Sequence, residues 1–158
     1  MKPYLVAASL ALLLNLSCSA IFSRLSSERR SQTAEQVVRE FVMLSAASET
    51  LQDKGKLQSL CVGELRAAFG EMTDDMFRMT YLGGKLKVQD LVTVHQVEQD
   101  DAAHVRYQIT VQNFQGTDPT LEINEREVDL IKRDGAWFIN DIRIKGSDRL
   151  AFTRGMIF

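Results

Sequence analysis

The stretch AHVRYQITVQNF (residues 103–114) decides the fold, because its side chains alternate strictly between apolar and polar. The apolar set comprises Val105, Tyr107, Ile109 and Val111, and the polar set comprises Arg106, Gln108, Thr110 and Gln112. A period of two residues is typical of a β-strand that buries one side against a core and leaves the other in solvent. The stretch therefore predicts a strand of an antiparallel sheet with one wet face.

Similar stretches on both sides of this strand predict three more strands. KLKVQDLVTVHQV (85–97) precedes it and loses its alternation near Asp90, which indicates a β-bulge there. TLEINEREVDLIK (120–132) and AWFINDIRIK (136–145) follow it. Turn residues separate the four strands: EQDDAA at 98–103, TDP at 117–119 and RDG at 133–135. Short loops between successive strands predict an antiparallel meander.

The last predicted strand is unusual because it is apolar on both faces. Trp137 and Ile139 point one way, and Phe138, Ile142 and Ile144 point the other. Either both faces are covered, or the outer face meets a partner. The C-terminal segment LAFTRGMIF (150–158) could cover that face or extend the sheet. The charge run EINEREVD (122–129), in the preceding strand, is interpreted as a solvated edge.

Helices are predicted before the sheet. Apolar periodicity indicates one over residues 33–49, with Thr33 as the N-cap and Gln36 at the capping-box position. A second helix is expected from about Lys54 to Phe69. Its apolar stripe consists of Leu57, Leu60, Cys61, Leu65 and Ala68. On this stripe, Cys61 is interpreted as a small buried hydrophobe.

A third, short helix is predicted within MTDDMFRMTYLGG (72–84), capped by Thr73 and ended by Gly83. The pair Asp74 and Asp75 complements the positive end of the helix dipole, which is its simplest explanation. Helices followed by an antiparallel meander indicate an α+β fold, with N-terminal helices packed on a curved, four-stranded sheet.

The N-terminus has the three parts of a secretory signal. Met1 and Lys2 supply positive charge, residues 5–14 are apolar, and residues 17–20 are small. About ten apolar residues are too few to cross a membrane as a helix, which needs about 20. We therefore expect the chain to be exported.

Two cleavage positions compete at the end of this signal. The small residues Cys18-Ser19-Ala20 fit cleavage after Ala20, whereas Leu14-Asn15-Leu16-Ser17-Cys18 resembles a bacterial lipobox, in which the cysteine becomes diacylated. Asn15 stands where the lipobox has an aliphatic residue, but Ser17 fits. We favour lipid attachment at Cys18. A disulfide between Cys18 and Cys61 is disfavoured, because Cys61 lies on a core-facing stripe.

Composition bounds the organisation of the 158-residue chain. A net charge of −2, with 45% hydrophobic and 25% charged residues, is ordinary for one globular domain. We expect a signal peptide at 1–17, a Ser- and Arg-rich tether at 18–32 and an α+β domain at 33–158. No basic patch interleaved with aromatic residues is present, so nucleic acid is not an expected partner.

The order of the predicted elements over residues 33–145, ending in DGAWFINDIRI (134–144), resembles the nuclear transport factor 2-like superfamily, a cystatin-like cone. It looks most like small bacterial envelope lipoproteins of that group, whose final hairpin carries a Gly-x-Trp-hydrophobic signature, here Gly135 to Ile139. The resemblance implies an internal pocket between the helices and the sheet. Members of the superfamily are enzymes, small-ligand binders or interaction modules, and no catalytic residue carries over to this chain.

For such a pocket, the best candidate residues are polar groups among apolar walls. They are Tyr107 on the apolar face of the regular strand, Asp141 on the last strand and Tyr81 near the end of the short helix. Asp141 could instead pair with Arg143 at the surface. His95 and His104 are interpreted as solvated strand residues, because a zinc site needs at least three protein ligands. We expect no metal, no cofactor and no assigned catalytic residue.

The leading hypothesis is a non-enzymatic envelope lipoprotein, held at a membrane by its lipid, whose cone domain binds a partner protein or a small apolar ligand. One alternative is a small isomerase, dehydratase or hydrolase that uses Asp141 with Tyr107. Another is a structural subunit of an envelope assembly, or a homodimer formed through the sheet. By resemblance to enteric lipoproteins, Ser19 after the cysteine favours an outer-membrane lipoprotein facing the periplasm, and cleavage after Ala20 would give a soluble periplasmic or secreted protein.

Overall fold

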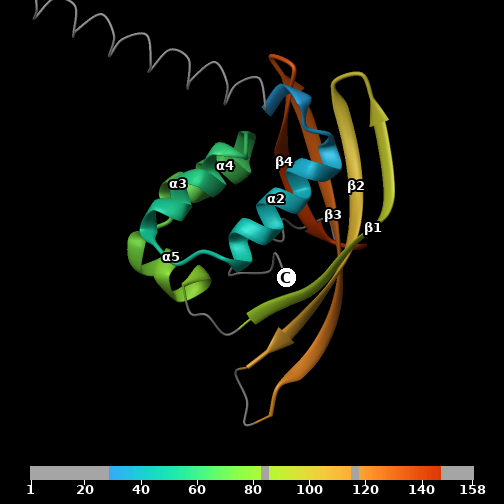
Figure 1. The fold of residues 1–158 in the computed structure, drawn as a ribbon. Helices are drawn as coiled ribbons and strands as arrows, with labels where there is room; N and C mark the ends of the chain where they lie inside the picture. Colours follow the sequence, from blue (N-terminus) through green and yellow to red (C-terminus); the bar gives the residue numbers. More distant parts are fainter. Residues whose placement is uncertain (1–28, 83–85, 115–117, 147–158) are drawn as a thin grey trace, which may run out of the picture.

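The computed structural model describes residues 29–82, 86–114 and 118–146. Helices α2 to α5 lie together on one side of a four-stranded antiparallel sheet (Figure 1). This arrangement confirms the α+β fold class expected from the sequence. The predicted signal at 1–17, Cys18 and the C-terminal segment 150–158 lie outside the described residues.

Helix α2 (Ala34–Ala46) confirms the first predicted helix and its cap. The Thr33 hydroxyl accepts a hydrogen bond from the Gln36 N–H at 3.2 Å, and the Gln36 side-chain oxygen accepts one from the Thr33 N–H at 2.9 Å. This reciprocal pair satisfies two donors that a helix start otherwise leaves unpaired. The helix buries one apolar stripe against the sheet: Ala34, Val37, Val38, Phe41 and Val42.

The single helix predicted from about Lys54 to Phe69 is wrong, because the chain forms two helices there. They are α3 (Leu51–Ser59) and α4 (Gly63–Glu71). The backbone between them pairs with the last strand instead: the Val62 N–H donates to the Ile139 carbonyl and the Ile139 N–H donates to the Leu60 carbonyl, both at 2.9 Å. Gly63 makes the turn into α4 at a φ of +59°, which a glycine adopts without strain.

Helix α5 (Asp74–Tyr81) confirms the third predicted helix and its cap. The Thr73 hydroxyl accepts a hydrogen bond from the Met76 N–H at 3.2 Å. Asp74 lies in the first turn and contacts the Lys54 ammonium group at 3.3 Å, as expected of a carboxylate at a helix start. The predicted stop at Gly83 lies outside the described residues.

The sheet contains β1 (Leu86–Gln99), β2 (Ala102–Asn113), β3 (Thr120–Arg133) and β4 (Ala136–Ile144), in that spatial order. Each strand pairs antiparallel with the next, which confirms the predicted meander. The hairpin turns use left-handed backbone at Asp100 and at Asp134–Gly135. In β1, the expected bulge lies between Val88 and Asp90, and a second one, which the sequence did not predict, lies between Thr93 and His95.

A bulge in β4 explains why this strand is apolar on both faces only when its residues are assumed to alternate regularly. Leu130 pairs with Ile139 and Asp129 pairs with Asp141, so Asn140 is an extra residue without a partner in β3. The bulge reverses the alternation, and both Ile139 and Ile142 are buried in the core. The expectation that Ile142 lies on the opposite face from Ile139 is therefore wrong.

The interpretation of residues 122–129 as a solvated edge is also wrong over the second half of that run. There β3 lies between β2 and β4, so it is a central strand. Arg126 and Val128 are buried, with exposed fractions of 6% and 0%. The charged residues that alternate with them, Glu125, Glu127 and Asp129, point to the other side of the sheet. Residues 125–129 thus belong to a central strand that has one buried face and one charged face.

Candidate functional site

The sheet has two faces of different character. The inner face packs against the helices, whereas no helix of the described chain covers the opposite one, called here the outer face (Figure 1). Strand β2 divides its side chains cleanly: Ala103, Val105 and Tyr107 are buried on the inner face, and His104 and Arg106 lie on the outer face. The outer face is thus where the sheet presents accessible side chains.

Four charged or polar residues form a connected group on the outer face, called here the outer-face cluster: His104, Asp129, Asp141 and Arg143. Asp129 lies opposite His104 on β2 and opposite Asp141 on β4. The Nδ1 atom of His104 is 2.8 Å from Asp129 Oδ1. Arg143 donates to Asp129 Oδ2, and its Nε atom lies 3.4 Å from Asp141 Oδ2.

The electrostatics of this cluster are those of two carboxylates that share one guanidinium. Burial raises the pKa of the Asp141 carboxyl, the positive charge of Arg143 lowers it, and the negative charge of Asp129 raises it. The side chain of Asp141 is 22% exposed, so water still screens these charges. The four residues thus form a charge network across the strands. In it Asp141 pairs with Arg143, which is the alternative that the sequence analysis gives for this residue.

A hollow of about 270 Å³ lies beside the cluster, toward the β1–β2 hairpin. The residues around it include Val97, Gln99, Ala102, His104, Asp129 and Ile131. Ala102 lies opposite both Gln99 and Ile131, and its small side chain leaves the space that a larger residue would occupy. The hollow is therefore mainly apolar, with the paired ring and carboxylate of His104 and Asp129 on one side.

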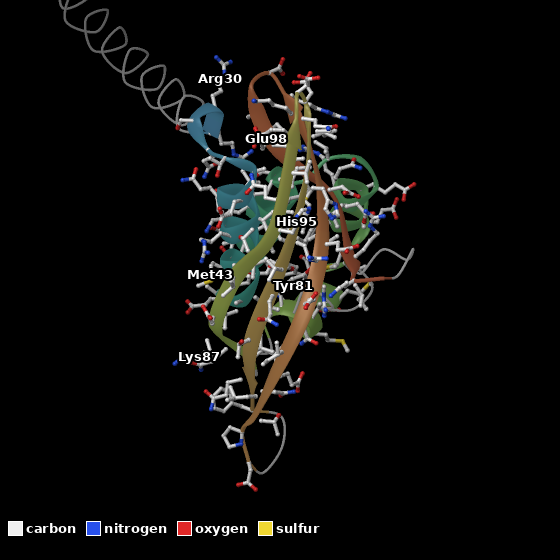
Figure 2. All side chains as sticks on the ribbon, turned by 90° about the vertical axis from the view of Figure 1, so that its right-hand side faces the viewer. Arg30, Met43, Tyr81, Lys87, His95 and Glu98 are labelled. Atoms are coloured by element: carbon white, nitrogen blue, oxygen red, sulfur yellow. The ribbon has the colours of Figure 1, made fainter. Side chains whose placement is uncertain are left out.

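Exposed apolar side chains lie along two strands away from this hollow. Val92 and Val94 on β1 are 44% and 46% exposed, and Leu121 and Ile123 on β3 are 69% and 64% exposed. Figure 2 shows the sheet from the side of β1, with His95 and Glu98 along the strand. Monomeric domains seldom expose several large apolar residues on one surface without a binding role.

The structure does not bring the three predicted site residues together. Tyr107 lies on the inner face, 1% exposed, and Asp141 lies on the outer face. Burial raises the pKa of the Tyr107 hydroxyl, and the guanidinium of Arg126, opposite it on β3, lowers that pKa. Since the sheet separates Tyr107 from Asp141, the two cannot act on one substrate in one pocket.

Tyr81 is also on the helical side of the sheet and is part of an aromatic group. Its ring stacks on Phe77 with a centroid distance of 4.7 Å and lies 6.0 Å from the ring of Phe69. Burial raises the pKa of its hydroxyl. These contacts are those of a packing residue.

The two histidines lie on the outer face of neighbouring strands, but not opposite each other. His95 pairs with Arg106, and His104 pairs with Val97. Within the described ranges, no group of three His, Cys, Asp or Glu side chains is arranged to hold a metal ion. His104 thus belongs with Asp129, and His95 remains exposed on β1.

Sequence reasoning missed Asp129, Arg143 and Ala102 as site residues. Asp129 belongs to the charge run that the sequence analysis interprets as a solvated edge. The bulge at Asn140 changes which residues of β4 share a face with Asp129, and regular alternation does not predict it. The sequence signal that could have found Asp129 is the pairing register of β3 and β4. Counting outward from the RDG turn, with one bulge in β4, places Asp141 opposite Asp129.

No helix in the described part of the chain has the length and apolar character that a membrane span requires. No protein-family profile and no curated protein sequence matches the chain. Similarity is found only among solved structures, and at low sequence identity.

The solved structures similar to this chain include two with TM-scores above 0.5. One is a SEC-C motif containing protein from Rhodopseudomonas palustris, with a TM-score of 0.53 and 15% identity, over 71% of this chain and 78% of that one. The other is the intermembrane space region of the chloroplast protein ARC6, with a TM-score of 0.54 and 11% identity, over 72% of this chain and 95% of that one.

A third similar structure is the VirB8 protein of Agrobacterium tumefaciens, with a TM-score of 0.45 and 14% identity, over 71% of this chain and 92% of that one. At 15% and 11% identity, the likeness to the SEC-C motif protein and to the ARC6 region shows a shared fold and nothing about activity. The chain is thus an α+β domain of helices on an antiparallel sheet, whose outer face carries its accessible polar cluster, hollow and apolar side chains.

Proposed function

We propose that this chain is a membrane-anchored, non-enzymatic envelope lipoprotein whose domain binds a partner protein through the outer face of its sheet. The observation that carries the proposal is the set of large apolar side chains on that face, of which Leu121 and Ile123 are the most exposed. Such residues are stabilised when a partner removes them from water, by roughly 25 cal/mol per Å² of apolar surface.

The residues on the inner side of the sheet favour a protein that binds a partner through its surface over an enzyme with an internal active site. The polar groups considered for a pocket there, Tyr107 and Tyr81, belong to the buried core, and the ring of Tyr81 packs against Phe69 and Phe77. The acid that an enzyme would have used with Tyr107, Asp141, lies on the other face.

The proposed anchor is a diacylated Cys18 at the end of the signal sequence. Two acyl chains hold a protein firmly at a membrane, whereas one chain gives only marginal attachment. About ten residues separate Cys18 from Arg29, so the domain would stay within about 35 Å of the bilayer even if that segment were fully extended.

The end of the domain that would face the membrane follows from the contacts of Arg29. Its guanidinium donates to the Ser59 carbonyl at 2.8 Å and lies over the ring of Phe138, 5.6 Å from the centroid. Phe138 is near the β3–β4 hairpin, and the β2–β3 hairpin is at the far end of the sheet (Figure 1). Leu121 and Ile123 would therefore project away from the membrane.

The similarity to the ARC6 region, which its description places in an intermembrane space, agrees with an envelope location. It supports the compartment proposed here and says nothing about the partner.

The anchor is tested by intact-mass measurement of protein extracted from membranes, compared with a Cys18→Ser variant. We expect a diacylated chain that begins at Cys18, and loss of membrane association in the variant. A soluble wild-type chain that begins at Ile21 and carries no lipid would rule out the anchor.

The partner surface is tested by placing a photo-crosslinking amino acid at Val92 or Ile123, which lie on the outer face, in the native host. Ala67, which is exposed on α4, provides a control position on the helical side. We expect a discrete crosslinked product of one composition from the two sheet positions and none from Ala67. Absence of any product from the sheet positions, or the same products from all three, would refute binding through the outer face.

A further inference from the structure

We propose that the hollow beside His104 and Asp129 receives one aromatic side chain of the partner protein, a tryptophan or tyrosine whose N–H or O–H donates to His104. The inference rests on the proposed function, since it names the chemistry that the outer face would recognise. It is carried by three features of the described residues: the shape of the hollow, its lining and the pairing of His104.

The shape of the hollow suits a single side chain. Its volume of about 270 Å³ is below the range of roughly 300–1,000 Å³ that is usual for pockets of small-molecule ligands. It lies on a face that no described helix covers, so a side chain can enter it from a partner surface (Figure 1). Pockets of this kind receive the buried aromatic residues that carry most of the energy of protein interfaces.

The lining of the hollow favours a flat apolar body. Val97 on β1 and Ile131 on β3 contribute aliphatic walls, and the small side chain of Ala102 on β2 lies between them. Val97 is 43% exposed, which means that apolar surface around the hollow remains in contact with water. An aromatic ring placed there would remove this surface from water at little cost in conformational entropy.

The pairing of His104 selects a ring that carries a hydrogen-bond donor. An ionised carboxylate can only accept, so the 2.8 Å contact between Asp129 Oδ1 and His104 Nδ1 requires the proton to be on Nδ1. The neutral imidazole then has its lone pair on Nε2, where it accepts a hydrogen bond. Phenylalanine has no donor to offer, whereas the indole N–H of tryptophan and the hydroxyl of tyrosine do.

Arg143 strengthens this selection by fixing Asp129. It binds the second carboxylate oxygen, Oδ2, and so leaves Oδ1 for the imidazole. Asp141, on the far side of Arg143, keeps that guanidinium in place. The outer-face cluster therefore supports one tautomer of His104, whose side chain lines the hollow.

The test uses N-acetyl-tryptophanamide as the probe and the full-length chain in detergent micelles, with binding followed by NMR chemical shifts of backbone amides. A single side chain is expected to bind weakly, with a Kd on the order of millimolar. We expect saturable shifts at Val97, His104 and Ile131. The same probe methylated on the indole nitrogen cannot donate, and it should bind about three- to tenfold more weakly.

Two variants provide matched controls. Ala102→Trp fills the hollow with the chain's own indole and should abolish the shifts, whereas Ala67→Trp adds the same residue on exposed α4 and should leave binding unchanged. If Ala102→Trp does not fold, His104→Phe removes the acceptor and should make the two probes bind equally. Equal binding of both probes to the wild type, or shifts that persist in Ala102→Trp, would overturn the proposal.

The outcome separates this inference from the proposed function. Crosslinking at Val92 or Ile123 without probe binding at the hollow would leave partner binding intact and refute the aromatic anchor alone. Probe binding without any crosslinked product would refute the proposed function and leave a hollow that binds indoles.

Discussion

Asp129 and Asp141 lie directly opposite each other on β3 and β4, and Arg143 contacts both carboxylates. Like charges at paired positions of a sheet are destabilising unless a cation lies between them. Arg143 supplies that cation from β4 itself, two residues after Asp141. The stability of this end of the sheet therefore depends on one guanidinium.

Replacement of this guanidinium in Arg143→Met should lower the free energy of unfolding by about 1–2 kcal/mol, because two facing carboxylates lose their shared partner. Urea denaturation at pH 7 measures the change. Arg78→Met is the control: Arg78 pairs with Asp75 at 3.3 Å, and both side chains are more than half exposed. Its removal should cost less than about 0.5 kcal/mol. Equal costs for the two variants would contradict the proposed role of Arg143.

The variant Asp141→Asn should change how stability depends on pH. Burial raises the pKa of the Asp141 carboxyl in the folded chain, so the folded state binds this proton more tightly than the unfolded state does. The contribution of Asp141 to the free energy of unfolding of the wild type therefore falls as pH rises above about 4, the ordinary pKa of an aspartate. Relative to the wild type, the Asn variant should gain up to about 1 kcal/mol between pH 3 and pH 7. Denaturation at both pH values checks this, and a constant difference would exclude it.

The strands, their turns and two of the helix starts could be predicted from sequence because their causes are local. Alternation over 103–114 and the caps at Thr33 and Thr73 involve residues within a few positions of one another. The break between α3 and α4 has a distant cause. It forms because Leu60 and Val62 hydrogen-bond to Ile139 at the edge of β4, and no periodicity in residues 54–69 reports that pairing.

That break provides a test with two glycines. In Gly63→Ala, a side chain must adopt a φ of +59°, and its Cβ would lie 2.8 Å from the Asn140 side-chain oxygen. We expect a loss of about 1–2 kcal/mol in the free energy of unfolding. Gly55→Ala, in the middle of α3 with nothing within 4 Å of the new Cβ, should instead gain about 0.5–1 kcal/mol. Thermal unfolding of both variants measures the two signs, and a stabilised Gly63→Ala would show that the turn is relaxed.

The candidate site was harder to predict than the fold, because it depends on which residues share a face across three strands. Tyr107 was correctly placed on the apolar side of its strand, but that side is core. Asp141 stands out in the sequence as an acid between Ile139 and Arg143, yet the bulge at Asn140 places it on the face opposite to Ile139. A hollow is harder still, since it arises where a small residue, Ala102, meets larger ones from other strands.

Cys61 should be chemically inert in the folded protein. Its side chain is fully buried, its thiol donates to the Leu57 carbonyl at 3.3 Å, and burial raises the pKa of the thiol. Since the thiolate is the reactive form, alkylation should be slow until the chain unfolds. Iodoacetamide labelling of the Cys18→Ser variant, with and without urea and read by mass spectrometry, isolates Cys61. Rapid labelling without denaturant would mean that the α3–α4 junction opens in the native state.

The bulge in β4 makes the sharpest prediction about the sheet, because it places Ile142 on the buried face with Ile139, whereas unbroken alternation would place the two on opposite faces. Ile142 and Ile144 are two residues apart, but Ile142 is 1% exposed against Val128, while Ile144 at the strand end is 36% exposed. Ile142→Ala should cost about 2–4 kcal/mol in urea denaturation, and Ile144→Ala less than about 1 kcal/mol. Deletion of Asn140 should cost less than Ile142→Ala, because Ile139, Asp141 and Ile142 would then alternate regularly and keep the faces that they have now. A deletion variant less stable than Ile142→Ala would mean that Asn140 is itself required for the packing of the strand.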